Sequence, residues 1–168
     1  MLLISDANVL IDMIAGELLE AMFQLQEEFA VPDTLFDEEL AARHPELPEQ
    51  GLMLMTVEPE GVMEAAQLVP QFDGRKAPGI ADLLALMLAK QEHCPLVTGD
   101  RRLREFAAED YPDIEIRGTL WLVGQLVITE VITVDEAEGA YEKMINQGSR
   151  LPQADIRKQL KQLRSQPV

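Results

Sequence analysis

The chain has 168 residues, a net charge of −16 and a single cysteine, Cys94. This length suits one domain that buries roughly two thirds of the surface of its unfolded chain, and a lone cysteine excludes an intrachain disulfide and argues against a cysteine-based zinc site. Apolar stretches such as LLALMLA are too short to span a bilayer and no signal-peptide pattern opens the chain, so we expect a cytoplasmic protein without membrane contact.

The charge is unevenly distributed along the chain. Residues 1–138 hold 28 acidic and 8 basic side chains, whereas residues 139–168 hold 2 acidic and 6 basic side chains. An acidic body of this kind repels a polyanion at long range unless metal ions or the basic tail intervene.

The first half of the chain alternates between short apolar runs and helical patterns. Apolar runs bounded by polar residues indicate buried strands, and apolar residues recurring every three or four positions indicate helices. The expected elements are a strand over Leu2–Ser5, helices over Asn8–Ala15 and Glu17–Glu28, a strand over Phe29–Asp33, a helix over Thr34–Arg43, a strand over Leu52–Glu58 and a helix over Gly61–Val69.

The second half continues the alternation after a predicted loop over Asp73–Gly79. The spacing of Ile80, Leu83, Leu84, Met87 and Leu88 predicts an amphipathic helix. The later expected elements are strands over Cys94–Thr98 and Ile114–Gly118, a helix that starts at Asp100, and helices over Thr119–Leu126, Val134–Asn146 and Pro152–Arg164. This order predicts one α/β domain over residues 1–168 with a parallel sheet and a helical C-terminal appendage over residues 134–168.

Four acidic residues follow the predicted strands. Asp6 follows the first strand, Glu39 lies on the helix after the second, Asp82 lies in the first turn of the amphipathic helix, and Asp100 follows the strand PLVTG. Because the carboxyl ends of parallel strands meet at one edge of a sheet, we expect these carboxylates to converge there. Helix N-termini, which favour negative charge, lower the cost of such crowding.

Carboxylates without a nearby histidine or cysteine suit Mg²⁺ or Mn²⁺ rather than zinc, and such a site performs phosphoryl chemistry. Asn8 and Thr98 could add polar contacts to a metal-bound water or a phosphate. A simpler interpretation stays open for each acid. Asp6 and Asp100 are good helix N-caps, Asp82 suits a helix dipole, and Glu39 belongs to an acidic, solvated helix face.

Four segments carry a resemblance to a known family: LLISDANVLIDMI, VPDTLFDEEL, GIADLLALMLAKQ and PLVTGDRRLREFA. In this order they resemble the PIN domain, the metal-dependent nuclease fold of VapC-type toxins. The tail, with IRGTLWLVGQLVITEVI and INQGSRLPQADIRKQLKQL, is similar to an uncharacterised bacterial and archaeal subgroup. The resemblance covers essentially the whole chain and implies a three-layer α/β/α sandwich that hydrolyses RNA with a water bound to Mg²⁺ or Mn²⁺.

The resemblance also implies roles for individual residues. The catalytic metal ligands would be Asp6, Glu39, Asp82 and Asp100, with Glu38 as an alternative to its neighbour Glu39. Asn8 matches the small polar residue after the first ligand, and Arg101 and Arg104 lie where a basic side chain could contact the scissile phosphate. The resemblance further implies a homodimer and silencing by a small antitoxin whose tail enters the active cleft.

A second function class is a catalytically silent PIN-fold module that binds a protein partner. Its contact would be the last helix, where basic residues oppose an Ile156, Leu160 and Leu163 stripe; a solvated helix face is the simpler interpretation. Trp121 lies among apolar residues at helical spacing, which predicts core or subunit-interface packing rather than base stacking. The sequence does not show the acidic pair, the phospho-acceptor Asp and the late lysine that a phosphorelay receiver domain needs. A phosphatase of the Asp-x-Asp type would need an acid at the position of Asn8.

Overall fold

The computed structural model describes residues 1–72 and 79–166, so residues 73–78 of the predicted Asp73–Gly79 loop lie outside its description. The described residues form a five-stranded sheet whose strand pairings are all parallel, in the order β3-β2-β1-β4-β5. The strands are β1 (Leu2–Ser5), β2 (Glu28–Pro32), β3 (Met53–Met55), β4 (Leu96–Val97) and β5 (Ile116–Arg117). Parallel pairing explains why a helix follows every strand, since each return to the sheet needs a crossover.

The helices cover the sheet and extend beyond it. They are α1 (Ala7–Ala15), α2 (Leu19–Met22), α3 (Asp33–Leu35), the π-helix η1 (Phe36–Leu40), α4 (Leu47–Gln50), α5 (Pro59–Leu68), the 3₁₀ turn η2 (Val69–Gln71), α6 (Ile80–Glu92), α7 (Arg101–Asp110), α8 (Thr119–Ile128), α9 (Val134–Asn146) and α10 (Gln153–Ser165). Among the described residues, none of these helices combines the length and apolarity required to cross a bilayer.

The order of the strands creates a switch point between β1 and β4. The chain moves from β1 through β2 to β3 on one side and then crosses to β4 and β5 on the other. Ile4 pairs with Leu96 and Ser5 with Val97, and the Asp6 N–H donates to the Val97 carbonyl at 3.1 Å. Open α/β sheets bind their ligands at the carboxyl ends of strands at such a point, because the two outgoing connections diverge there.

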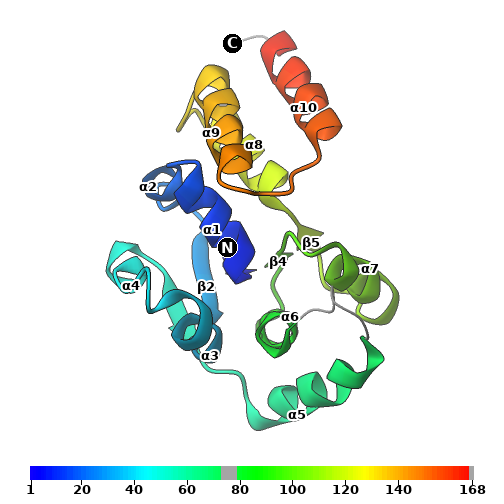
Figure 1. The fold of residues 1–168 in the computed structure, drawn as a ribbon. Helices are drawn as coiled ribbons and strands as arrows, with labels where there is room; N and C mark the ends of the chain where they lie inside the picture. Colours follow the sequence, from blue (N-terminus) through cyan, green and yellow to red (C-terminus); the bar gives the residue numbers. More distant parts are fainter. Residues whose placement is uncertain (73–78, 167–168) are drawn as a thin grey trace.

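The layers are those of an α/β/α sandwich, as the sequence predicted. Helix α6 packs against β1, β2 and β4 and is covered by α5, whereas α1 packs against α8 and α9. Figure 1 shows α5 and α6 on one side of the strands and α1 with α8–α10 on the other. The sandwich leaves the carboxyl edge of the sheet between the first turns of α1 and α7.

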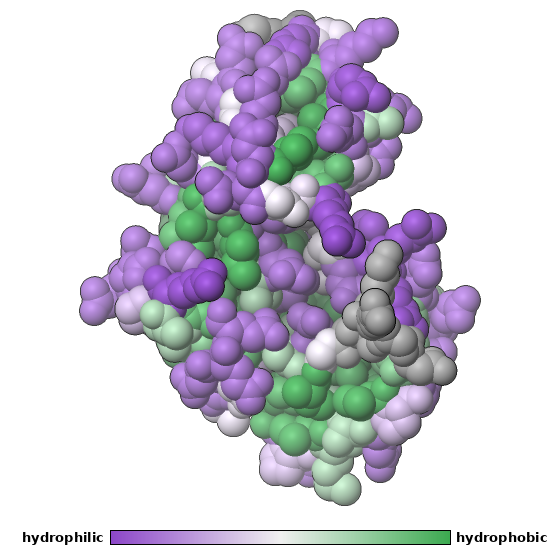
Figure 2. Space-filling view, viewed as in Figure 1, coloured by the Kyte–Doolittle hydropathy of each residue, from purple (hydrophilic) through white to green (hydrophobic). Residues whose placement is uncertain are grey.

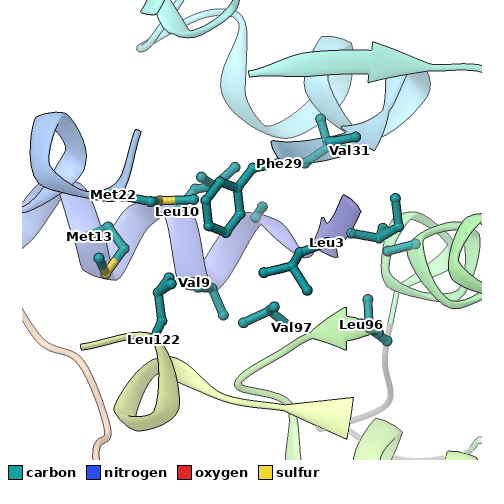
Figure 3. Packing of buried hydrophobic residues seen from close by; sticks show 14 of the residues in the cluster. Leu3, Val9, Leu10, Met13, Met22, Phe29, Val31, Leu96, Val97 and Leu122 are labelled. Carbon is teal, nitrogen blue, oxygen red and sulfur yellow. The ribbon is translucent and has the colours of Figure 1, made fainter. Parts of the chain in front are cut away.

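The core fixes the direction of α1. Val9, Leu10 and Met13 are fully buried, and Figure 3 shows them among side chains that include Phe29 of β2 and Leu122 of α8. Burying a side chain of this size stabilises the fold by roughly 1.5–3 kcal/mol. Because α1 is held on its buried face, its first turn is held at the end of β1.

Several elements differ from their predicted bounds. The helix predicted over Glu17–Glu28 is wrong: only α2 forms, because β2 must already pair with β1 at Glu28. The predicted Thr34–Arg43 helix is divided between α3 and η1, and the predicted Leu52–Glu58 strand is only β3.

The predicted amphipathic helix, α6, is instead buried on nearly all sides. Ala85, Leu86 and Ala89 are inaccessible to solvent, whereas Ile80, assigned to the apolar face, is 39% exposed. The physical reason is that α5 covers the side of α6 that faces away from the sheet.

Candidate active site

Asp6 is buried at the N-terminus of α1 and has a hydrogen-bond donor on each carboxylate oxygen. The Val9 N–H donates to Oδ1 at 2.8 Å. The Thr98 hydroxyl donates to Oδ2 at 2.5 Å, and the Gly99 N–H donates to the same oxygen at 3.2 Å. Thr98 and Gly99 follow β4 directly, so the pairing of β1 with β4 places these donors beside the carboxylate.

Burial raises the pKa of Asp6 from its ordinary value of 3.8 to about 7. This value is the net result: the charge of Asp82 adds to the effect of burial, whereas the hydrogen bonds from Thr98, Val9 and Gly99 oppose it. Desolvation is the dominant cause because an isolated carboxylate loses most of its hydration when it is buried. An acid whose proton is held this tightly in the fold is suited to a site where a cation replaces the proton.

Asp82 and Asp100 cap α6 and α7, and each gives one oxygen to its own helix. The Gly79 N–H donates to Asp82 Oδ2 at 3.2 Å, and the Leu103 N–H donates to Asp100 Oδ1 at 2.9 Å. Within the described residues, no hydrogen bond engages the second oxygen of either carboxylate. The pKa of Asp82 is raised by burial and by the charge of Asp100.

Thr98 connects two of these acids. Its hydroxyl donates to Asp6 and accepts from the Asp100 N–H at 3.1 Å. A single side chain therefore fixes the spacing between the cap of α1 and the cap of α7. The predicted contact of Thr98 with a metal-bound water or a phosphate stays a prediction, because in this structure its hydroxyl bonds to Asp6 and to the Asp100 N–H.

Glu39 lies on η1 with its side chain exposed. Its pKa is raised by partial desolvation, by the charge of Asp82, and by that of its neighbour Glu38. Asp82 thus acts electrostatically on both Asp6 and Glu39, and Asp100 acts on Asp82. These pairwise effects link Asp100 to Asp82, and Asp82 to both Asp6 and Glu39.

The other predicted side chains are arranged less uniformly. Asn8 is exposed and lines a cleft of about 400 Å³ together with Gly99. Arg101 turns back along its own helix and pairs with Glu105 at 2.9 Å. Arg104 instead extends toward the sheet edge, where a Cβ on Gly118 would lie 3.9 Å from its Nη1 atom.

Asp12 was missed in the sequence. Its carboxylate accepts hydrogen bonds from the Thr119 hydroxyl at 3.0 Å and from the Ser149 hydroxyl. Burial raises its pKa, and the two hydroxyls lower it. The available signal was a lone acid inside the apolar helical pattern NVLIDMIA, but its partners lie more than 100 residues away and leave no local trace.

The switch-point fold and its cluster of carboxylates define an α/β/α protein with an acidic site at the carboxyl edge of a parallel sheet. A family model described as a PIN domain matches residues 2–165, and the chain belongs to the PIN-domain family. Among curated proteins, no match was found. PIN domains are generally nucleases and typically use divalent metals.

The donor chemistry of the site fits such a metal. Hard divalent cations prefer carboxylate oxygens, and the mutual charges of these acids are what a cation would neutralise. As the side chains stand, however, no three acidic, histidine or cysteine residues among residues 1–72 and 79–166 are close enough to hold one ion. Binding would therefore draw the free oxygens of Asp82, Asp100 and Glu39 toward Asp6.

Proposed function

We propose that this protein is a metal-dependent endoribonuclease that hydrolyses RNA phosphodiester bonds at the Asp6–Glu39–Asp82–Asp100 cluster with Mg²⁺ or Mn²⁺. The observation that carries the proposal is the convergence of these four carboxylates, from separate elements, into one electrostatic field at the switch point of a PIN domain. Independent helix caps need not meet in this way.

The surroundings of each acid indicate its role in the proposed site. Asp6, locked by three donors, supplies the fixed ligand, and Asp82 and Asp100 each offer their free oxygen. When bound, the cation lowers the pKa of a water and offsets charge on the phosphate. Glu39, exposed on η1 and within reach of the charge of Asp82, would complete the set of ligands.

The test is cleavage of a mixed-sequence RNA by the purified protein with Mg²⁺ or Mn²⁺, compared with EDTA. A double variant, Asp6→Asn with Asp100→Asn, should lose the metal-dependent cleavage, and a circular dichroism spectrum should show that it folds. Asp113→Asn removes an acid remote from the cluster and should cleave like the wild type. Cleavage that survives in the folded double variant would refute the site.

A matched pair of variants tests which residue of η1 is the metal ligand. Glu39→Gln and Glu38→Gln remove the same charge from adjacent residues of η1. We expect the first to reduce cleavage strongly and the second weakly, because the charge of Asp82 acts on Glu39. The reverse order would assign the ligand to Glu38.

The competing function is a catalytically silent PIN-fold interaction module. The absence of a ready three-ligand group among the described residues favours it. Titration calorimetry with Mn²⁺ discriminates the two functions. Saturable binding that the Asp6→Asn, Asp100→Asn variant loses supports the nuclease, and no binding together with no cleavage supports the module.

We also propose that the chain acts in the cytoplasm as a homodimer and as the toxin of a toxin–antitoxin pair. Its membership of the PIN family supports this assignment. Induced expression in bacteria should arrest growth, whereas expression of the Asp6→Asn, Asp100→Asn variant should not. Unaffected growth on expression of an active nuclease would remove the toxin part of the proposal.

A further inference from the structure

A second cleft opens beside the carboxylate cluster and has the opposite charge. Its volume is about 760 Å³, and its wall includes Thr98 and Gly99, the donors to Asp6. Four arginines from three parts of the fold line it: Arg101 and Arg104 of α7, Arg117 of β5, and Arg150 between α9 and α10. Figure 2 shows the outline of the molecule narrowing on the right at this level, between α7 below and α10 above.

The concentration of positive charge here is unexpected for so acidic a chain. The protein has 14 lysines and arginines against 30 acids, yet among the described residues that line this cleft the only carboxylate is Asp155. Within the described part of the chain, Arg104 and Arg150 have no ion-pair partner. Unpaired guanidinium groups in a groove are suited to phosphate oxygens, which they bind through charge-assisted hydrogen bonds.

The cleft also contains a flat surface. The Arg117 guanidinium lies over the Trp121 ring, 4.1 Å from its centroid, and Arg117 also pairs with Glu115. Trp121 is half-buried, so the predicted packing of its ring against the core is accompanied by an exposed edge in the cleft. Nucleic-acid bases stack on arginine planes and on indole rings, and this stacking needs an unpaired strand.

Arg104 and Arg150 reach the cleft from opposite directions. Arg104 comes from α7 and lies beside Gly118 at the end of β5. Arg150 comes from the connection between α9 and α10, where the hydrogen bond from Ser149 to Asp12 fixes the preceding residue. Arg150 and Gly99 also line the smaller cleft that contains Asn8, so the two clefts are adjacent and share part of their walls.

We propose that this arginine cleft binds the phosphate backbone of a single strand of nucleic acid and stacks one base on the Arg117–Trp121 pair, next to the acidic cluster. The inference rests on the proposed nuclease function and assigns its substrate form and path. The volume of the cleft is that of a small-molecule site, which suits a short stretch of one strand better than the wider body of a duplex. The arrangement also explains how an acidic protein holds a polyanion.

The test is binding of a short, fluorescently labelled single-stranded RNA by anisotropy, in EDTA and at low salt so that no cleavage occurs. Arg104→Ala with Arg150→Ala should weaken binding at least about tenfold and reduce the slope of log affinity against log salt by about 1.4, or 0.7 for each lost phosphate contact. The matched control, Lys158→Ala with Lys161→Ala, removes the same charge from the exposed face of α10 and should bind like the wild type.

Trp121 supplies a local signal because it is the only tryptophan in the chain. Its fluorescence should change on addition of RNA, and Arg117→Ala should weaken binding while Arg117→Lys, which keeps the charge but not the plane, should restore little of it. Single-stranded DNA of the same sequence should bind similarly if the phosphate backbone dominates. A requirement for RNA would add recognition of the 2′-hydroxyl, whereas equally tight binding of a duplex would overturn the inference.

The failures of the two proposals are distinguishable. RNA that binds through the arginines but is not cut with Mg²⁺ or Mn²⁺ leaves the cleft standing and refutes the nuclease. Cutting that is unaffected by Arg104→Ala with Arg150→Ala, or binding without a change in Trp121 fluorescence, refutes the cleft and leaves the nuclease. No binding by the wild type at low salt, or equal loss in the lysine control, also refutes the cleft.

Discussion

The two ends of helix α1 each carry a desolvated carboxylate held by a threonine hydroxyl, but the two regions differ in what surrounds them. Asp6 accepts from Thr98 and lies in the field of Asp82. Asp12 accepts from Thr119 and Ser149, and only burial and these hydroxyls shift its pKa. Asp6 is the more deeply buried of the two, and it alone is also influenced by the charge of another carboxylate; this crowding of like charge is the feature that we associate with the candidate active site.

The largest expected difference between the two ends is in cleavage. Asp6→Asn should lower the rate about 1,000-fold or more, because a lost metal ligand costs several kcal/mol of transition-state stabilisation. Asp12→Asn should lower it less than about tenfold, as expected for a residue that acts only through its neighbours. Single-turnover cleavage at saturating RNA measures both. Equal losses would mean that the junction belongs to the catalytic machinery.

The next difference is in pH dependence. The metal-free fold holds the Asp6 proton with a pKa of about 7, against 3.8 ordinarily, which corresponds to about 4 kcal/mol. Because only the folded state has the raised pKa, this group stabilises the folded protein relative to the unfolded chain most below about pH 4. The folded protein loses this advantage as the pH rises from about 4 through about 7. Urea unfolding in EDTA should show stability falling over this range, and Asp6→Asn should remove most of the fall. A stability that rises with pH would contradict the assignment.

The two threonines offer the same substitution at both ends. Thr98→Val and Thr119→Val each remove one donor from a desolvated carboxylate, which should cost about 1–3 kcal/mol of unfolding free energy. Only Thr98→Val should also reduce cleavage, by about 10–100-fold, because Thr98 orients Asp6 and receives the Asp100 N–H. This prediction would be contradicted most directly if Thr119→Val lost cleavage without any loss of unfolding free energy.

The smallest effect on stability is expected for an exposed ion pair near Asp12. Lys143 of α9 pairs with Glu17 just beyond the end of α1, and both side chains are more than half exposed. Solvent and salt screen such a pair, so Lys143→Ala should leave the melting temperature essentially unchanged. Thermal unfolding at low and high salt checks this, and a large, salt-sensitive loss would show that surface charge, rather than Asp12, holds α9 against α1.

The sequence predicted the part of the fold that depends on local chemistry. The apolar run before Asp6, the helix over Val134–Asn146 and the alternation of strands and helices along the chain could be predicted because each depends on residues close in the chain. The Glu17–Glu28 helix failed because the apolar spacing of Leu18, Met22 and Leu25 is satisfied by a short helix followed by turns, and pairing of β2 with β1 overrides it.

The candidate site shows the same contrast between what local sequence predicts and what depends on long-range packing. The four acids were identified because strand ends in a parallel sheet converge by topology. The Asp12 junction and the arginine cleft were not, since Thr119, Ser149, Arg117 and Arg150 reach them through tertiary packing of segments far apart in the sequence. The metal, the RNA and the roles of the acids stay predictions.

The π-turn that carries Glu39 makes this site sensitive to chain length as well as to residue type. In η1 the Ala41 N–H bonds to the Phe36 carbonyl at 2.8 Å, so one turn holds a residue more than an α-helix would. Deleting a residue there would restore regular winding and turn the positions beyond it by about 100° around the axis. Loss of one of the two apolar residues of this turn, Phe36 or Leu40, would therefore shift this part of the chain relative to the other three acids while leaving the carboxylate of Glu39 in the sequence.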